Sequence, residues 1–154
     1  MPENKINFID LAAVYKLRQG EFDAAIAATL ASADYINGKA LAEFNLSLAA
    51  FTGAQNMITC GNGTDALQIA MMGLDLKPGD EVITADFTFA ATVEVIALLQ
   101  LTPVLVDVDL HNMNIAIEAI QKAITPKTKA IVPVHLFGRA ANMEAIMAIA
   151  KANN

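Results

Sequence analysis

The chain has 154 residues, 55% of them hydrophobic, and a formal net charge of −6. This length suffices for a domain with a sizeable core. Its ten basic residues are scattered, which disfavours nucleic-acid binding because a phosphate backbone requires clustered Lys and Arg. No stretch approaches the roughly 18 consecutive apolar residues of a membrane-spanning helix, and the first ten residues lack the basic and apolar regions of a secretory signal.

The mean hydropathy of +0.45 is high for a self-contained soluble domain. We interpret the excess apolarity as surface that further chain or a second subunit covers. A single cysteine, Cys60, excludes an internal disulfide and any cysteine-based metal cluster. We expect Cys60 to be a small buried hydrophobic residue, and these features together favour a cytoplasmic enzyme.

Helices are expected in the first third of the chain. A short extended segment at residues 6–9 precedes a helix over 11–30, with an interruption at Gly20, because apolar residues recur there at nearly helical spacing. Residues 33–39 contain Asp, Asn and Gly and predict a loop. A second helix over 40–51 is closed by Gly53. We therefore divide the chain into an N-terminal helical segment, 1–52, and an α/β part, 53–154.

From residue 57 the chain alternates between short apolar runs and helical patterns. The runs are nearly continuous, as expected for strands covered on both faces. Repeated β-α-β units with short links predict a parallel or mostly parallel sheet with right-handed crossovers, an open α/β fold. The expected strands are 57–60, 81–84, 103–106 and 130–134, and the expected helices are 64–74, 88–101, 115–124 and 142–152.

Ligands of such folds bind beyond the carboxyl ends of the strands. The segment there with the most chemical information is GNGT at residues 61–64. Its glycines permit a tight turn, and the helix that Thr64 and Asp65 open can hold a phosphate at its N-terminus. A plain strand-to-helix turn capped by Thr64 or Asp65 explains the motif equally well. The spacing of a dinucleotide fingerprint fails at Ala66, and no Gly-Lys-Ser/Thr of a P-loop follows.

Aromatic rings follow the strand at 81–84. Phe87 and Phe89 lie just past its end, where a ring can stack on a planar cofactor. A phenylalanine is more often a core residue than a stacking platform, and the position beside the phosphate candidate strengthens the case for stacking.

Polar residues follow the other two strands. Asp107 and Asp109 suggest a metal site, but nothing else supplies a third ligand, so a solvated turn is favoured. His135 ends the last strand and either contacts substrate or makes a structural hydrogen bond, of which we favour the second. His111 lies in a polar loop and is expected at the surface.

Seven segments occur in an order that resembles sugar aminotransferases of the DegT/DnrJ/StrS type. They are INFIDL (6–11), YING (35–38), GNGTDAL (61–67), PGDEVIT (78–84), FTFAATVE (87–94), VDVD (106–109) and AITPKTKAIVPVHLFG (123–138). Each is weak alone, but together and in register they cover essentially the whole chain. The resemblance implies the aspartate-aminotransferase fold (fold type I), here its first part, and a homodimer with active sites at the subunit interface.

The resemblance also implies site residues. Gly63 and Thr64, with Asn62 nearby, match the phosphate cradle of pyridoxal phosphate, and Phe89 matches the residue that stacks on its pyridine ring. The loop containing Tyr35 resembles one near the substrate. At Gly38 the family often continues with Pro, whereas this chain has Lys, which puts the substrate contact in doubt.

The family places the Asp that faces the pyridine nitrogen, and then the Schiff-base Lys, farther along than this chain extends. Eight lysines are present, and none lies in a matching context. Lys77, Lys127 and Lys129 are expected to be solvated surface charges. The chain thus resembles the beginning of an enzyme that stops before its catalytic lysine, and alone we expect it to be inactive.

The implied reaction transfers an amino group from glutamate to a nucleotide-linked keto-sugar, UDP- or dTDP-linked, for a surface polysaccharide such as lipopolysaccharide. The run GNGTDALQI at 61–69 most resembles enzymes acting on 3-keto sugars, including a UDP-linked N-acetylhexosaminuronate. Amination at C4 stays open. So do a dehydratase of the same family, in which His replaces the Schiff-base Lys, and a non-catalytic truncated or regulatory relative.

Overall fold

The computed structural model describes residues 8–153. They form two compact units, one ending at Thr59 and one beginning at Cys60. The extended segment expected at 6–9 lies partly outside the described residues, and Phe8 and Ile9 form a bend. Within residues 8–153, no helix is long and apolar enough to cross a membrane.

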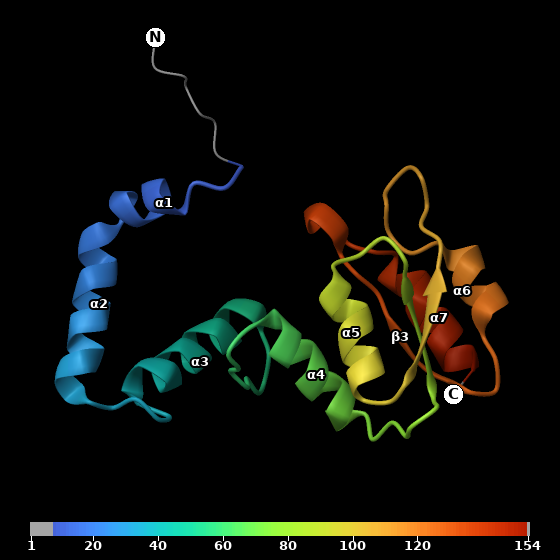
Figure 1. Ribbon diagram of the computed structural model, residues 1–154, viewed down its shortest axis with the longest axis horizontal. Helices are drawn as coiled ribbons and strands as arrows, with labels where there is room; N and C mark the ends of the chain where they lie inside the picture. The colour runs from blue at the N-terminus through green and yellow to red at the C-terminus, as the bar shows by residue number, and fades with distance from the viewer. Residues whose placement is uncertain (1–7, 154) are drawn as a thin grey trace, which may run out of the picture. The chain divides into compact units, whose positions relative to one another are not determined.

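The first unit contains three helices: α1 (Leu11–Leu17), α2 (Gln19–Ser32) and α3 (Lys39–Thr52) (Figure 1). The helix expected over 11–30 is broken at Arg18, where φ is −126°, and not at Gly20, which lies inside α2. The loop expected at 33–39 is confirmed over 33–38, and Lys39 already begins α3. Gly53 closes α3 with φ of 73°, the left-handed conformation that glycine adopts without a steric penalty.

None of these three helices buries a residue. Leu17 and Phe51 have 85% and 87% of their surface exposed, although both belong to the apolar patterns that predicted the helices. The first unit therefore has no core within its helices. That further chain or a second subunit covers this apolar surface stays a prediction.

The second unit is built on a sheet of three parallel strands in the order β2-β1-β3 (Figure 1). The strands are β1 (Glu81–Ala85), β2 (Thr102–Val106) and β3 (Thr128–Val132). The expected strand at 57–60 is wrong, since those residues form no ladder with any described part of the chain. Three apolar residues and a threonine satisfy a strand's hydropathy, but a strand also needs a neighbour for its backbone hydrogen bonds.

Helices cover both faces of this sheet: α4 (Gly63–Gly73), α5 (Ala90–Leu98), α6 (Ile117–Ala123) and α7 (Met143–Ala152). Successive side chains of β1 point to opposite faces. Val82 packs with Val95 and Ile96 of α5 in one cluster, whereas Ile83 packs with residues of α6 and α7 in the other. Figure 1 shows α5 on one side of the sheet and α6 on the other. The expected parallel α/β fold class is confirmed.

Burial differs among the strands. Four of the five residues of the central strand β1 are buried, whereas β2 and β3 are partly exposed. The nearly continuous apolar run that predicted β1 thus reflects cover on both faces, as expected. The three strands are parallel, so their carboxyl ends meet at one edge. We call this the carboxyl edge, and the loops that follow the strands there are residues 86–89, 107–116 and 133–142.

Candidate functional site

The N-terminus of α4 is organised by Asn62. Its Oδ1 accepts a hydrogen bond from the Asp65 backbone N–H at 3.0 Å, and its Nδ2 donates to Asp65 Oδ2 at 3.1 Å. Asn62 itself is extended, with φ of −165°, as N-cap residues usually are. The cap is therefore Asn62 and not Thr64 or Asp65, the two residues that the plain-turn interpretation named.

The first turn of α4 leaves backbone donors available. The N–H groups of Gly63 and Thr64 have no acceptor among the described residues, as is normal for a first helical turn. A Cβ built at Gly63 would meet no atom within 4 Å, so the space beside these donors is open. Two free N–H groups, the positive end of the helix dipole and open space together fit a phosphate group.

The loop after β1 carries two aromatic rings in different surroundings. Phe89 directly precedes α5 in an extended conformation and has 78% of its surface exposed. Phe87 is 48% exposed and packs edge-on against the ring of Phe137, with centroids 6.3 Å apart. Phe89 is therefore not a core residue, and its free ring has the exposure that stacking on a planar ligand requires.

The carboxylates after β2 shape their own loop. Asp107 Oδ1 accepts from the Val108 N–H at 2.8 Å, and Asp109 Oδ1 accepts from the His111 N–H at 2.7 Å. Nowhere in residues 8–153 do three or more His, Cys, Asp or Glu side chains gather so that they can hold a metal ion. Both carboxylates thus act as turn acceptors.

The loop after β3 is closed by His135. Its Nδ1 accepts a hydrogen bond from the Ala141 N–H at 3.0 Å, which is the structural bond that the sequence favoured. Asn114, in the loop after β2, is a residue that sequence reasoning missed. It is 4% exposed and donates to the carbonyls of Arg139 and Ala140. No local pattern reveals Asn114, because its partners lie more than 20 positions away in the chain.

Two more residues were singled out in the sequence, Cys60 and Tyr35. Cys60 is exposed and not buried as expected, because it belongs to the turn before α4 and not to a strand of the sheet. Its Sγ lies 3.3 Å from the Asn62 carbonyl oxygen. Tyr35 belongs to the first unit, where its hydroxyl donates to the Leu30 carbonyl at 3.3 Å and its side chain is largely exposed.

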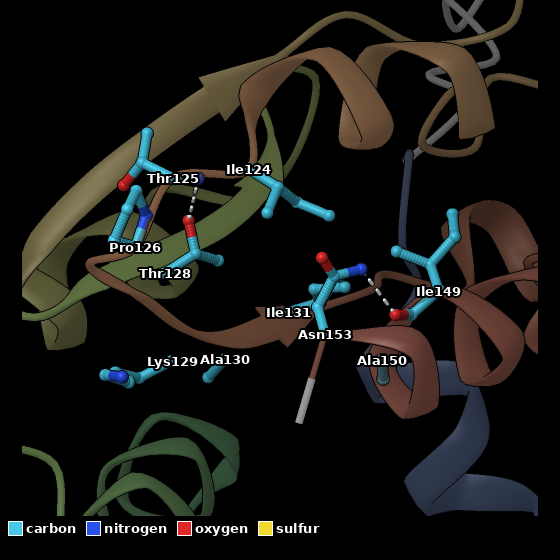
Figure 2. A pocket seen from close by; sticks show the side chains of 10 residues that line it. All are labelled: Ile124, Thr125, Pro126, Thr128, Lys129, Ala130, Ile131, Ile149, Ala150 and Asn153. Carbon is cyan, nitrogen blue, oxygen red and sulfur yellow. Dashed lines mark hydrogen bonds between the residues drawn. The ribbon is translucent and has the colours of Figure 1, made fainter.

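A separate hollow of about 390 Å³ opens at the amino end of β3 (Figure 2). It lies between the turn before β3 and the end of α7, so it is at the opposite end of the strands from the carboxyl edge. Its internal hydrogen bonds are local: Thr125 N–H to Thr128 Oγ1, and Asn153 Nδ2 to the Ile149 carbonyl. None of the predicted cofactor residues lines it, and the candidate site comprises the N-terminus of α4 and the carboxyl edge.

A comparison with protein-family models identifies the family of this chain. Residues 17–154 match the model of the DegT/DnrJ/EryC1/StrS aminotransferase family, which is nearly the whole chain. This chain is a member of that family. The family assignment made from the sequence is thereby confirmed.

Two curated relatives match this chain over nearly its whole length. It is 48% identical over 145 residues to UDP-2-acetamido-2-deoxy-3-oxo-D-glucuronate aminotransferase of Pseudomonas aeruginosa, covering 94% of this chain and 40% of the relative. It is 42% identical over 146 residues to the pleiotropic regulatory protein of Geobacillus stearothermophilus, covering 95% of this chain and 39% of that one. The chain thus spans about 40% of the length of these relatives.

Solved structures agree. A DegT/DnrJ/EryC1/StrS aminotransferase from Brucella abortus is 41% identical with a TM-score of 0.92, over 97% of this chain and 42% of that one. NtdA from Bacillus subtilis, solved with the cofactor PMP bound, is 29% identical with a TM-score of 0.87, over 99% of this chain and 36% of the other. The fold type I assignment of this family member is confirmed.

Proposed function

We propose that this chain is the cofactor-binding part of a pyridoxal-phosphate-dependent enzyme that aminates a nucleotide-linked keto-sugar. The observation that carries the proposal is the open, donor-bearing N-terminus of α4 in a member of an aminotransferase family. The bound PMP of NtdA supports the cofactor. The name of the Pseudomonas relative supports a 3-keto, UDP-linked sugar.

The residues present fit this cofactor. The phosphate would lie against the N–H groups of Gly63 and Thr64, where the helix dipole stabilises negative charge. The side chain of Asn62 is fixed by its two hydrogen bonds with Asp65, so it holds this turn in place. The exposed ring of Phe89 offers a flat apolar face to the pyridine ring. When bound, pyridoxal phosphate supplies the electron sink for amino transfer, and the protein orients it.

Two arginines in the chain are candidates to hold a substrate carboxylate. Enzymes acting on amino acids often hold the substrate carboxylate with an Arg in a bidentate pair. Arg18 pairs with Glu21 at 2.6 Å, and the side chain of Arg139 donates to the His111 carbonyl at 3.5 Å. Glutamate as donor and a homodimer complete the proposal.

A second candidate function is regulatory binding without turnover. It is favoured by the 42% identity to a relative named a pleiotropic regulatory protein. Such a protein would use the same phosphate-binding turn to hold cofactor or sugar. Binding alone therefore does not separate the two functions, whereas amination of a keto-sugar does.

The phosphate site can be tested with two glycines of one helix. Gly63 begins α4 and Gly73 ends it, and a Cβ at either would meet no atom within 4 Å. Both Gly→Ala variants should raise the free energy of unfolding, by about 0.5–1 kcal/mol, because alanine loses less entropy in a helix. Only Gly63→Ala places a methyl group in the proposed phosphate space.

We therefore expect Gly63→Ala to weaken binding of pyridoxal phosphate to the full chain at least about tenfold, measured by absorbance titration. Gly73→Ala should bind as the unaltered chain does. Equal affinity in both variants would show that the phosphate does not lie at this turn, and the proposed cofactor site would be wrong.

A further inference from the structure

The buried polar side chains of the described residues share one feature. They are Thr84, Thr92 and Asn114, each no more than 5% exposed. Each makes its hydrogen bonds at the carboxyl edge: Thr84 Oγ1 donates to the Val132 carbonyl at 2.9 Å, and Thr92 Oγ1 bonds with Thr88 Oγ1 at 3.2 Å. A buried polar group that loses its partner destabilises the fold, which a buried apolar residue would not do. We therefore ask what each of these three side chains contributes.

Asn114 connects two of the loops at this edge. Its Nδ2 donates to the carbonyls of Arg139 at 3.1 Å and Ala140 at 3.3 Å, and its Oδ1 accepts from the Leu136 N–H at 3.2 Å. Its own backbone N–H donates to Asn112 Oδ1 at 2.8 Å, which fixes the loop after β2. One side chain thus makes three hydrogen bonds to the backbone of the loop that follows β3.

That loop holds a conformation that it would not keep unaided. Phe137 has φ of 52° and Gly138 has φ of 81°, so two successive residues are left-handed. A bulky residue adopts this conformation only when its surroundings impose it. The ring of Phe137 is 86% exposed, so burial does not impose it. The hydrogen bonds of Asn114 to both sides of Phe137 hold this conformation, together with the backbone bonds from the Gly138 N–H to the His135 carbonyl at 3.3 Å and from the Arg139 N–H to the Leu136 carbonyl at 3.0 Å.

The same loop fixes the tautomer of His135. Because Nδ1 accepts the Ala141 N–H, the proton of the neutral imidazole is on Nε2. The His135 side chain is exposed. The loop therefore presents one N–H donor of defined identity at the carboxyl edge, and its Phe137 ring packs on Phe87.

We propose that Asn114 is a positioning residue of the candidate site, which acts through the loop of residues 135–141 to present His135 Nε2–H to a bound ligand. The role is a hydrogen bond to an acceptor oxygen of that ligand. The proposal rests on the proposed function only in placing the ligand at the carboxyl edge.

The bond pattern requires an amide of this length. Asp at position 114 would keep an acceptor for the Leu136 N–H but lose both donors, and would place a charge against the carbonyls of Arg139 and Ala140. Ala would leave all three backbone groups without their partner. Ile115, the next residue, is equally buried but apolar, so Ile115→Val is a matched control that disturbs packing and not the hydrogen bonds.

The experiment uses NMR on the full chain, first unaltered. Long-range ¹H–¹⁵N spectra should show His135 with its proton on Nε2, and this resonance should shift when pyridoxal phosphate saturates the protein. The amides of Leu136 and Ala141 should exchange with solvent at least about tenfold more slowly than the amide of Phe137, for which the structure provides no acceptor.

The variants then test Asn114 itself. Asn114→Ala should give a mixture of His135 tautomers and raise the exchange rate of both amides about tenfold, and Asn114→Asp should also lose the defined tautomer. Ile115→Val should change neither by more than about twofold. An unaltered chain with the proton on Nδ1, or with unprotected Leu136 and Ala141 amides, would overturn the proposal even if the variants fail to fold.

Two further outcomes are separable. If the unaltered chain does not bind pyridoxal phosphate, the proposed function fails, while tautomer and amide protection still decide the role of Asn114. If the chain binds pyridoxal phosphate but the His135 Nε2–H resonance does not move, the site stands and the presentation of His135 to the ligand is wrong.

Discussion

Replacing Phe89 by Ala should weaken cofactor binding while leaving the stability of the cofactor-free protein nearly unchanged. Phe89 is 78% exposed, so its removal takes little buried area from the folded state. We expect the free energy of unfolding without cofactor to change by no more than about 0.5 kcal/mol. With cofactor bound, the lost stacking and the lost apolar contact together amount to about 2 kcal/mol, which is about a 30-fold rise in Kd.

The two quantities can be measured in one set of unfolding experiments. At a pyridoxal phosphate concentration 100 times the Kd of the unaltered protein, binding stabilises the folded state by about 2.7 kcal/mol. A 30-fold weaker variant would gain only about 0.9 kcal/mol at the same concentration. Denaturant titrations with and without cofactor should therefore differ by nearly 2 kcal/mol more in the unaltered protein than in Phe89→Ala.

Ile96→Ala, in the helix that Phe89 directly precedes, is the matched control. Ile96 is fully buried in the cluster between α5 and the sheet, so its truncation should cost about 2–5 kcal/mol both with and without cofactor. If Phe89→Ala behaves in this way, losing stability equally under both conditions, then Phe89 is a packing residue and does not stack on the cofactor.

Four further results are expected. Asn62→Ala should lower the free energy of unfolding by about 1 kcal/mol and Asn62→Ser should recover most of it, measured by urea titration, because both Asn and Ser cap the N-terminus of α4. In a Tyr35→Phe background, ultraviolet titration should show a raised pKa for Tyr15, because its hydroxyl donates to Asp23 at 2.7 Å, and Asp23→Ala should lower that pKa. The bond needs the phenol proton, so its contribution to stability is present below the ordinary pKa of tyrosine and is lost as pH rises through the raised value. Borohydride reduction with pyridoxal phosphate should label no single lysine stoichiometrically, since every lysine in residues 8–153 is exposed, and specific labelling of one would contradict this. An enzyme that contains this chain should aminate UDP- or dTDP-linked keto-sugars with glutamate, as seen by mass analysis, and efficient turnover of pyruvate instead would refute the substrate class.

Features set by neighbouring residues could be predicted from the sequence. The turn before α4 follows from the two glycines at 61 and 63, although its cap is Asn62 and not the predicted Thr64 or Asp65, and Gly53 ends α3 as its place predicted. The buried strand β1 follows from an apolar run that needs cover on both faces. Each of these features depends on neighbouring residues, so it can be predicted from local hydropathy and from the residue types of the turns.

Features set by distant partners could not be predicted. Residues 57–60 have a strand's hydropathy and no strand beside them. The break between α1 and α2 is a local feature that was also missed: it lies at Arg18, while the glycine two positions on continues the helix. The sheet does not include residues 57–60, so Cys60 at the end of this segment is exposed and not buried.

The carboxyl edge depends both on local sequence motifs and on contacts between residues far apart in the chain. The aromatic rings of this edge and the phosphate donors of α4 belong to short motifs, so they could be recognised one loop at a time. Their arrangement depends on hydrogen bonds between loops: Thr84 reaches a residue 48 positions away, and Asn114 reaches residues 22 to 26 positions away. The side chains of Thr84 and Asn114 are both buried. A buried hydrogen bond is stronger than one at the surface, and its loss destabilises the protein more. A site assembled in this way should lose its geometry before the unit loses its fold, which is why tautomer, amide exchange and cofactor affinity are sharper tests of it than the melting temperature.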